Sequence, residues 1–191
     1  MRPGADCRKA VFLDRDGVLV VPCFREGRSF APLSLDEYRC YPDAAACLQR
    51  LKQAGFALVV VTNQPDVGAG RVSRDIVEEM HRRLAERMPV DAIKACFHTE
   101  QDRCTCRKPR PGMFFTAARE LGIDLATSFM VGDRRSDIEA GAAAGCRTVF
   151  IDLGYTTEKP PDRPNQVVKT LAEATTWILS RTEMGQADDD R

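Results

Sequence analysis

Short, uninterrupted apolar runs alternate along this chain with stretches of helical periodicity, and this alternation constrains the fold most. The runs KAVFLD (9–14) and FALVVVT (56–62) are apolar at successive positions. Strands that are apolar on both faces are typical of a parallel sheet whose two sides are covered by helices. The sequence therefore predicts an α/β protein with three layers, in which helices flank a central parallel sheet on both sides.

The same pattern predicts where individual elements begin and end. Strands are expected at 9–14, 56–62, 92–98, 128–132 and 147–152. Helices are expected at 43–54, 73–88, 112–122, 136–144 and 171–179, with Ser73 as an N-cap. The segment 15–42 has no clear periodicity and is expected to be irregular. Because there is no internal repeat or linker, we expect one domain over 1–181 and a disordered tail over 182–191.

Charge and composition exclude several classes of protein. The 191 residues contain 28 basic and 28 acidic side chains, and this zero net charge argues against a nucleic-acid-binding protein. No run approaches the roughly 18 apolar residues that span a bilayer. The first ten residues have no apolar core of a signal peptide, so we expect a cytoplasmic protein. Its eight cysteines are then expected to be thiols or metal ligands.

Polar side chains follow three of the predicted strands at their carboxyl ends. Asp14 and Asp16 follow the first, Thr62, Asn63 and Gln64 the second, and Asp133 the fourth. In open α/β sheets, ligands bind beyond the carboxyl ends of the strands. We therefore expect these side chains to emerge, unburied, at one edge of the sheet. A lone D-x-D or T-N pair is usually only a solvated turn, but their joint occurrence at strand ends indicates a site.

The residue types at this edge suit phosphoryl transfer. Asp14 and Asp16 point to the same side of an extended segment and would repel each other unless a cation lies between them. Mg²⁺ suits such an oxygen-rich site, and Asp133 is a further candidate ligand. One carboxylate can attack phosphorus while another moves the proton, although spacing alone does not decide which does which. Thr62 and Lys108 are candidates to contact the phosphoryl oxygens.

Four segments together resemble the motifs of the haloacid dehalogenase (HAD) superfamily of phosphatases: DRDGV (14–18), VVVTNQ (59–64), RKPRPG (107–112) and VGDRRSD (131–137). The resemblance covers about 9–152. It implies a Rossmann-like fold, with Asp14 as the nucleophile and Asp16 as the general acid/base. It also implies that Mg²⁺ is held by Asp14, the main-chain carbonyl of Asp16, and Asp133. Asp137 would act indirectly, through water or Lys108.

A second metal site is predicted by the segment CFHTEQDRCTC (96–106). Cys96, His98, Cys104 and Cys106 form a set of three thiols and one imidazole, which suits tetrahedral Zn²⁺. Four protein ligands leave no open position, so the zinc would be structural. The alternative is a chance grouping of thiols. The other cysteines show no such grouping, and the second histidine, His81, is expected at the surface of the 73–88 helix.

This zinc loop resembles the branch of the superfamily that contains heptose-bisphosphate phosphatases and histidinol-phosphatases. The chain has no room for a cap domain, so substrate contacts would come from the long insertions 18–42 and 96–108. The candidate substrate-binding residues are Asn63, Gln64, Arg107, Arg134, Arg25 and Arg28. The resemblance implies a monomer that removes the 7-phosphate of a heptose 1,7-bisphosphate. The alternatives are a histidinol-phosphate or other small sugar-phosphate phosphatase and, outside the enzymes, a zinc-containing interaction module.

Overall fold

The computed structural model describes residues 7–25, 28–155 and 158–186, and its centre is a six-stranded parallel sheet. The strand order is β5-β4-β1-β6-β7-β8. The strands are β1 (Ala10–Leu13), β4 (Ala57–Asn63), β5 (Ala92–Cys96), β6 (Phe129–Gly132), β7 (Arg147–Ile151) and β8 (Gln166–Val168). The first five confirm the predicted strands. Among the described helices, none has the length and apolar character that crossing a bilayer requires.

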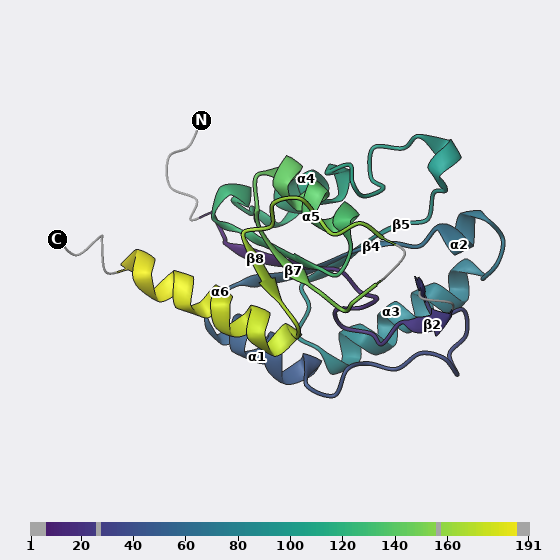
Figure 1. Cartoon of the computed structure of the whole chain (residues 1–191), viewed down its shortest axis with the longest axis horizontal. Coiled ribbons are helices and arrows are strands. Elements are labelled where there is room, and N and C mark those ends of the chain that lie inside the picture. The colour runs from purple at the N-terminus through teal and green to yellow at the C-terminus, as the bar shows by residue number, and fades with distance from the viewer. Residues whose placement is uncertain (1–6, 26–27, 156–157, 187–191) are drawn as a thin grey trace.

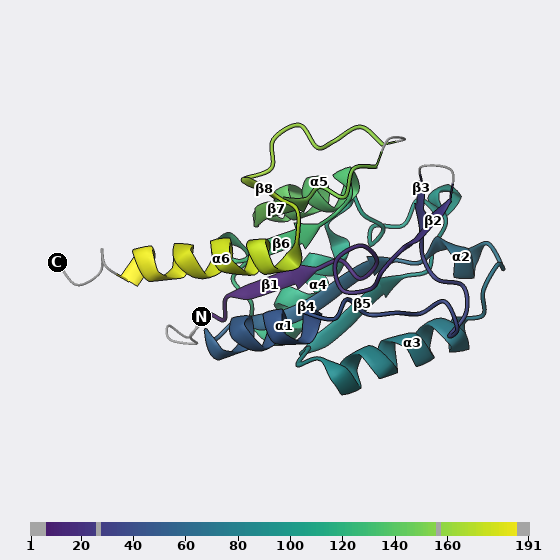
Figure 2. The same ribbon diagram turned by 60° about the horizontal axis from the view of Figure 1, so that its bottom comes forward.

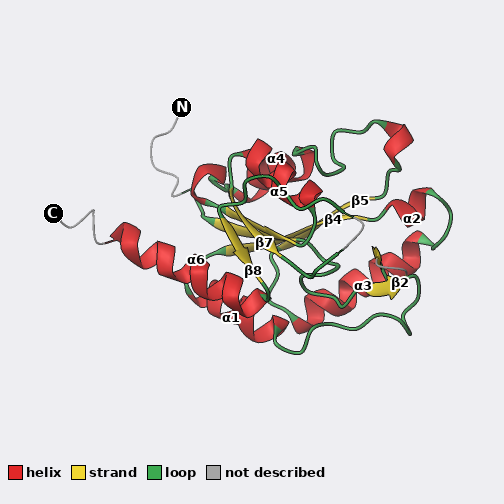
Figure 3. Cartoon of the chain, in the orientation of Figure 1, coloured by secondary structure: helices red, strands yellow, loops and turns green. Residues whose placement is uncertain are grey.

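Helices cover both faces of the sheet, which confirms the predicted three-layer architecture (Figure 1). One side carries α1 (Ala44–Gln53), α3 (Arg74–Arg87) and α6 (Leu171–Gln186), and the other carries α4 (Gly112–Leu121) and α5 (Arg135–Ala144). Figure 3 shows the strands fanning out between these two groups of helices.

Alternate side chains of β1, β4 and β6 enter the two separate apolar cores. In β1, Val11 and Leu13 pack with α1, α3 and α6, whereas Ala10 and Phe12 pack with α4 and α5. All four side chains are fully buried, as the apolar runs of the sequence predict.

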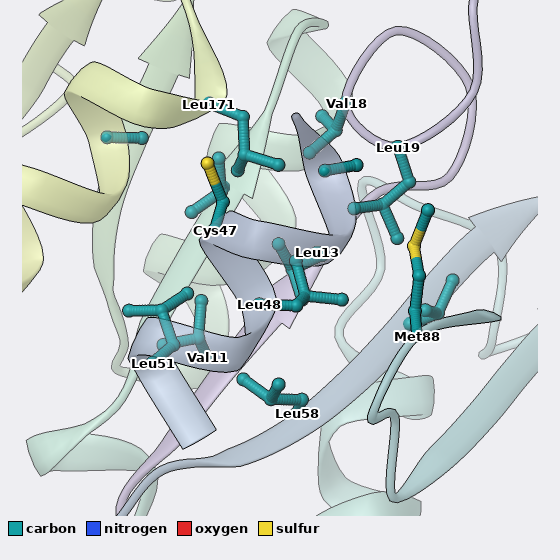
Figure 4. Packing of buried hydrophobic residues seen from close by; sticks show 14 of the residues in the cluster. Val11, Leu13, Val18, Leu19, Cys47, Leu48, Leu51, Leu58, Met88 and Leu171 are labelled. Atoms are coloured by element: carbon teal, nitrogen blue, oxygen red, sulfur yellow. The ribbon is translucent and has the colours of Figure 1, made fainter. Parts of the chain in front are cut away.

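Helix α1 shows how the larger core is built. Its buried residues Ala44, Cys47, Leu48 and Leu51 recur at the spacing of one helix face. Figure 4 shows Cys47, Leu48 and Leu51 among the side chains of the underlying strands. The packing holds β1 in the middle of the sheet and thereby fixes the position of whatever follows its carboxyl end.

Three expectations about the fold are wrong. The segment 15–42 contains a hairpin of β2 (Cys23–Arg25) and β3 (Arg28–Phe30), a separate antiparallel sheet near α2 (Pro65–Gly68) in Figure 2. The sheet also has a strand that was not predicted, β8. These strands have three residues each, too few to show a period. Finally, α6 continues to Gln186, so 182–186 are helical; the rest of the expected disordered tail, 187–191, lies outside the described residues.

Candidate active site

The sheet order brings the polar residues of three strands to one edge. Because β1 lies between β4 and β6, Asp14 at the end of β1 is flanked by Asn63 of β4 and by Asp133 after β6. The backbone N–H of Asp14 donates to the carbonyl of Val131 at 2.9 Å, which continues the pairing of β1 with β6 by one residue. The structure therefore brings these polar residues together at one edge of the sheet, as the sequence predicts.

A buried lysine links the carboxylates at this edge. Lys108 Nζ lies 2.9 Å from Asp14 Oδ1 and 2.6 Å from Asp137 Oδ1, and it donates to the carbonyl of Val61 at 2.7 Å. Burial alone would lower the pKa of Lys108, but the charges of Asp137 and Asp14 outweigh it and raise the pKa to about 12. Lys108 is therefore a permanent cation between two carboxylates.

The side chain of Asn63 fastens the backbone of Lys108 to the end of β4. Its Nδ2 donates to the Lys108 carbonyl and its Oδ1 accepts from the Lys108 N–H, each at 3.0 Å. This pair of bonds spans two segments that are 45 residues apart in sequence. Asn63, expected to bind substrate, thus also positions the lysine.

The carboxylates are buried, which corrects the expectation that they emerge exposed at the edge. Asp14 is 6% exposed and Asp133 1%, and one oxygen of each lies within 4.8 Å of the others and of one from Asp137. Burial, followed by the charges of Asp14 and Asp137, raises the pKa of Asp133 well above its usual range. Burial and Asp14 likewise raise the pKa of Asp137 to about 6. Three carboxylates around a single lysine leave excess negative charge at the site.

These residues fit a divalent cation. Asp133 Oδ1 is buried and has no hydrogen-bond partner in the described part of the chain, so an acceptor atom faces the carboxylate cluster unsatisfied. The backbone of Gly17 also lies very close to the Asp133 carboxylate. A Cβ at Gly17, whose φ is +93°, would lie 2.1 Å from Asp133 Oδ2. Oxygen ligands and excess negative charge are what Mg²⁺ selects. The site is thus consistent with the expected magnesium.

The Asp16 carboxylate lies outside the cluster of three carboxylates and accepts hydrogen bonds from two neighbouring side chains. Arg15 donates to it through Nε (3.0 Å to Oδ1) and Nη2 (2.9 Å to Oδ2), and Gln64 Nε2 donates to Oδ2 at 2.7 Å. Gln64 Nε2 also donates to Thr62 Oγ1 at 3.0 Å. The expectation that Mg²⁺ meets Asp16 through its main-chain carbonyl, which stays a prediction, agrees with this orientation of the side chain.

Sequence reasoning missed Arg15 and misplaced His81. Arg15 is fully buried, and its Nη1 lies 3.2 Å from Nε2 of His81. His81 is therefore half-buried behind the Asp16 carboxylate instead of lying at the surface. Burial, and then the charge of Arg15, lowers the pKa of His81 from 6.5 to about 4. A histidine on a helix whose other face is charged gives no sequence signal of this contact.

A cavity of about 720 Å³ opens beside these residues. Asp14, Asp16, Asn63 and Lys108 line it. The wall also contains charged residues of both signs: Arg28, Asp66, Arg71, Glu100, Arg107, Arg110, Arg134, Asp137 and Glu158. Neither Thr62 nor Gln64 is among the described residues of its wall, and both are buried. Arg25 belongs to β2, but its side chain lies outside the described part of the structure.

The arginines of the cavity differ in what they already bind. Arg107 Nη1 is buried and has no hydrogen-bond partner among the residues described. Arg134, in contrast, donates to the Ser29 carbonyl at 2.7 Å and Oγ at 2.6 Å, and it forms an ion pair with Glu158. Arg134 therefore holds the hairpin against α5, whereas Arg107 retains donors for an anion.

The four predicted zinc ligands come together just before Lys108. Cys106 Sγ lies 3.2 Å from Cys96 Sγ, 3.4 Å from Cys104 Sγ and 3.3 Å from His98 Nδ1. Tetrahedral zinc with sulfur ligands at about 2.3 Å and nitrogen at about 2.0 Å requires donor atoms roughly 3.5–3.8 Å apart. Cys96 Sγ lies 3.6 Å from both Cys104 Sγ and His98 Nδ1, within this range, and the three distances from Cys106 are 0.1–0.3 Å below it, so the cluster is consistent with Zn²⁺. Its metal would fix the loop that leads into Arg107 and Lys108.

Comparison with known proteins agrees with this geometry. Residues 105–174 match the HAD-hydrolase-like family model. The chain is 38% identical to the D-glycero-beta-D-manno-heptose-1,7-bisphosphate 7-phosphatase of Pasteurella multocida, over 87% of this chain and 94% of the relative. The protein of the same name from Pseudomonas aeruginosa is 33% identical, over 90% of this chain and 98% of the relative. This chain belongs to the HAD-like hydrolases.

The solved structures give the same result for this HAD-type phosphatase. The D,D-heptose 1,7-bisphosphate phosphatase of B. bronchiseptica, in complex with magnesium and phosphate, superposes with a TM-score of 0.77 at 32% identity. That comparison covers 91% of this chain and 99% of the other. The phosphatase from Burkholderia thailandensis has a TM-score of 0.64 at 28% identity, over 91% and 99%. Magnesium in the first of these relatives supports the metal inferred from the carboxylates.

The buried His81 should make stability depend on pH. Because its pKa is about 4 in the folded state and 6.5 when unfolded, the unfolded chain takes up a proton in this window that the native state does not. This group therefore makes the free energy of unfolding fall as the pH drops from about 6.5 to about 4. The variant His81→Gln keeps a hydrogen-bond acceptor for Arg15 but has no imidazole to titrate. We therefore expect its free energy of unfolding to fall less over this pH range than that of the wild type. Urea unfolding at both ends of this pH range measures the free energy of unfolding of each protein. An equal decrease in the wild type and the variant would contradict the role assigned to His81.

The thiol and imidazole cluster should hold about one zinc ion per chain, distinct from exchangeable magnesium. Cys104→Ser removes one ligand and should lower both the zinc content and the thermal stability, because structural zinc contributes on the order of 10 kcal/mol in small peptides. Elemental analysis and thermal unfolding measure both quantities. The matched control is Cys7→Ser, which changes an exposed thiol outside the cluster. Zinc-free protein from zinc-supplemented growth would contradict the prediction.

Proposed function

We propose that this enzyme removes the 7-phosphate of D-glycero-D-manno-heptose 1,7-bisphosphate through an aspartyl-phosphate intermediate. The observation that carries the proposal is the cavity itself. Its wall has the Asp14–Lys108 pair and Arg107, whose Nη1 has no partner in the described part of the chain. Relatives at 33–38% identity over most of the chain bear the name of this activity. A substrate with two phosphates offers one to the carboxylates and a second to the arginine.

Asp14 is the proposed nucleophile. Its Oδ1 is held by Lys108 Nζ at 2.9 Å and by the Arg15 N–H at 2.8 Å, so that the carboxylate has a fixed orientation beside the cavity. In the first step an Asp14 oxygen bonds to phosphorus and the bond between phosphorus and the sugar oxygen breaks. Lys108 balances charge on Asp14 and Asp137 throughout, because it stays protonated at neutral pH.

Asp16 is the proposed general acid and then general base. In the first step it donates a proton to the sugar oxygen that leaves. In the second step it accepts a proton from the water that attacks the acyl phosphate, which releases inorganic phosphate and restores Asp14. Arg15 and Gln64 hold the Asp16 carboxylate at the cavity wall during both steps.

The metal belongs beside this pair. Mg²⁺ bound by Asp14, the Asp16 carbonyl and Asp133 would supply positive charge that stabilises the transferred phosphoryl group. Asp137 meets the site through Lys108, at 2.6 Å, which agrees with the indirect role expected for it. The described hairpin residue Arg28 lines the same cavity and is a further candidate for the second phosphate.

Asp14→Asn keeps the shape of the side chain and removes its charge. Phosphate release should fall by several orders of magnitude, because groups that act as a unit lose most of their effect together. Circular dichroism should show an unchanged fold. Turnover that remains substantial, with the same magnesium dependence, would exclude Asp14 as the nucleophile.

Arg107→Ala tests the substrate. Loss of charge-assisted hydrogen bonds should lower kcat/KM for the heptose bisphosphate by roughly 10- to 100-fold, and for a heptose monophosphate far less. Arg119→Ala is the matched control, since this exposed arginine of α4 does not line the cavity. An assay of phosphate release gives kcat/KM for the heptose bisphosphate, the heptose monophosphate and histidinol phosphate. If histidinol phosphate were turned over as well as the bisphosphate, the proposed substrate would be wrong.

A further inference from the structure

Tyr155 lies where the candidate metal site meets the hairpin. Its hydroxyl donates a hydrogen bond to Asp133 Oδ2. Its ring packs against Phe24 of β2, with the ring centroids 5.3 Å apart. The guanidinium of Arg134 lies 5.9 Å from the same ring. Tyr155 follows β7 in a loop and carries no motif, so sequence reasoning passed over it.

The two oxygens of Asp133 have different surroundings. Oδ2 accepts from Tyr155, and a Cβ at Gly17 would lie 2.1 Å from Oδ2 and 2.9 Å from Oδ1. Oδ1 is buried and without a partner among the described residues, and Asp133 belongs to the three-carboxylate cluster. A carboxylate fixed through one oxygen presents the other in a set direction. Hydrogen bonds of this kind orient metal ligands in many proteins.

The hydroxyl of Tyr155 is suited to this task. A phenol hydroxyl is a hydrogen-bond donor at neutral pH, because its unperturbed pKa is about 10. An acceptor in its place would repel the carboxylate. A phenylalanine would leave Asp133 Oδ2 buried without this donor and would free the carboxylate to rotate.

The hairpin in turn sets the position of Tyr155. Phe24 covers one part of its ring, and the hairpin is held in place by Arg134, which donates to Ser29 of β3 at 2.6 and 2.7 Å. Phe24 is 54% exposed, and its ring contact with Tyr155 joins the hairpin to the loop after β7. The wall of the cavity is thus connected to Asp133 through one aromatic side chain.

We propose that Tyr155 is a positioning residue for magnesium, which turns Asp133 Oδ1 toward the metal, and that Phe24 of the hairpin supports it. This inference rests on the proposed function in one respect, the role of Asp133 as a magnesium ligand. It makes the metal affinity depend on the hairpin, which lies outside the carboxylate cluster.

The test measures magnesium binding without substrate, from the rise of Tm with MgCl₂ concentration. For Tyr155→Phe we expect an apparent Kd raised by about 10-fold or more, in the range that outer hydrogen bonds to metal ligands show. For Phe24→Ala we expect a smaller increase, of about 2- to 5-fold, because the tyrosine remains and only its support is lost. Phe30→Ala is the matched control: it removes the other exposed aromatic ring of the hairpin and should leave the Kd unchanged.

Activity gives a second, independent readout. The MgCl₂ concentration for half-maximal phosphate release should rise with the Kd, while kcat at saturating MgCl₂ stays within about twofold. A role confined to stability would lower Tm without moving either magnesium constant. Phe24 is an exposed residue, so its variant keeps the test decisive even if Tyr155→Phe folds poorly.

The outcomes separate the two proposals. A wild-type protein that binds magnesium and releases phosphate, with a Tyr155→Phe variant of unchanged or lower Kd, overturns the inference about Tyr155 alone. The same holds if Phe30→Ala weakens magnesium binding as much as Phe24→Ala does. A wild-type protein that neither binds magnesium nor releases phosphate overturns the proposed function, and the inference with it.

Discussion

The ion pairs of one buried lysine hold the site together. Lys108 lies between Asp14 and Asp137, and all three side chains are nearly or fully inaccessible to solvent. Removing one partner from such a group leaves an uncompensated buried charge and typically costs about 3–5 kcal/mol. The rest of the site depends on the position of this ammonium group. Asn63 binds the Lys108 backbone to β4, and the cluster of Cys96, His98, Cys104 and Cys106, which is consistent with zinc, precedes the lysine in the chain.

The lysine also leaves a charge imbalance that explains the chemistry of the site. One cation lies among three clustered carboxylates, and Asp133 Oδ1, which has no partner among the described residues, marks where the remaining positive charge belongs. The described walls of the cavity include the β2–β3 hairpin, the loop that carries Arg107, α2 and the segments around Arg134 and Glu158, so charged groups from several segments can contribute to selectivity.

Sequence reasoning predicted the features that depend on a local pattern of neighbouring residues. Long apolar runs predicted five of the six strands of the sheet, and their carboxyl ends predicted that Asp14, Asn63 and Asp133 would meet. It failed where the decisive contact is made by a residue distant in sequence. Arg15 and His81 are 66 residues apart, and Tyr155 is 22 residues from Asp133, so neither pair leaves a local pattern. The depth of the carboxylates was misjudged because burial depends on what packs over the sheet edge. The hairpin and β8 were missed because three residues are too few to show a period.

The order of strands has a consequence for how the protein acquires its activity. Parallel neighbours in this sheet are joined only through crossovers, and the bonds around Lys108 join residues 45 and 47 positions apart, while Ala10 binds Ser128 across 118. Such non-local contacts close late, since a large loop entropy opposes each of them until the surrounding core has formed. No fragment of the chain contains Asp14, Lys108 and Asp133 together unless it spans most of the domain. Catalysis is therefore a property of the completely folded chain, and the appearance of phosphatase activity during refolding would report the last contacts to form.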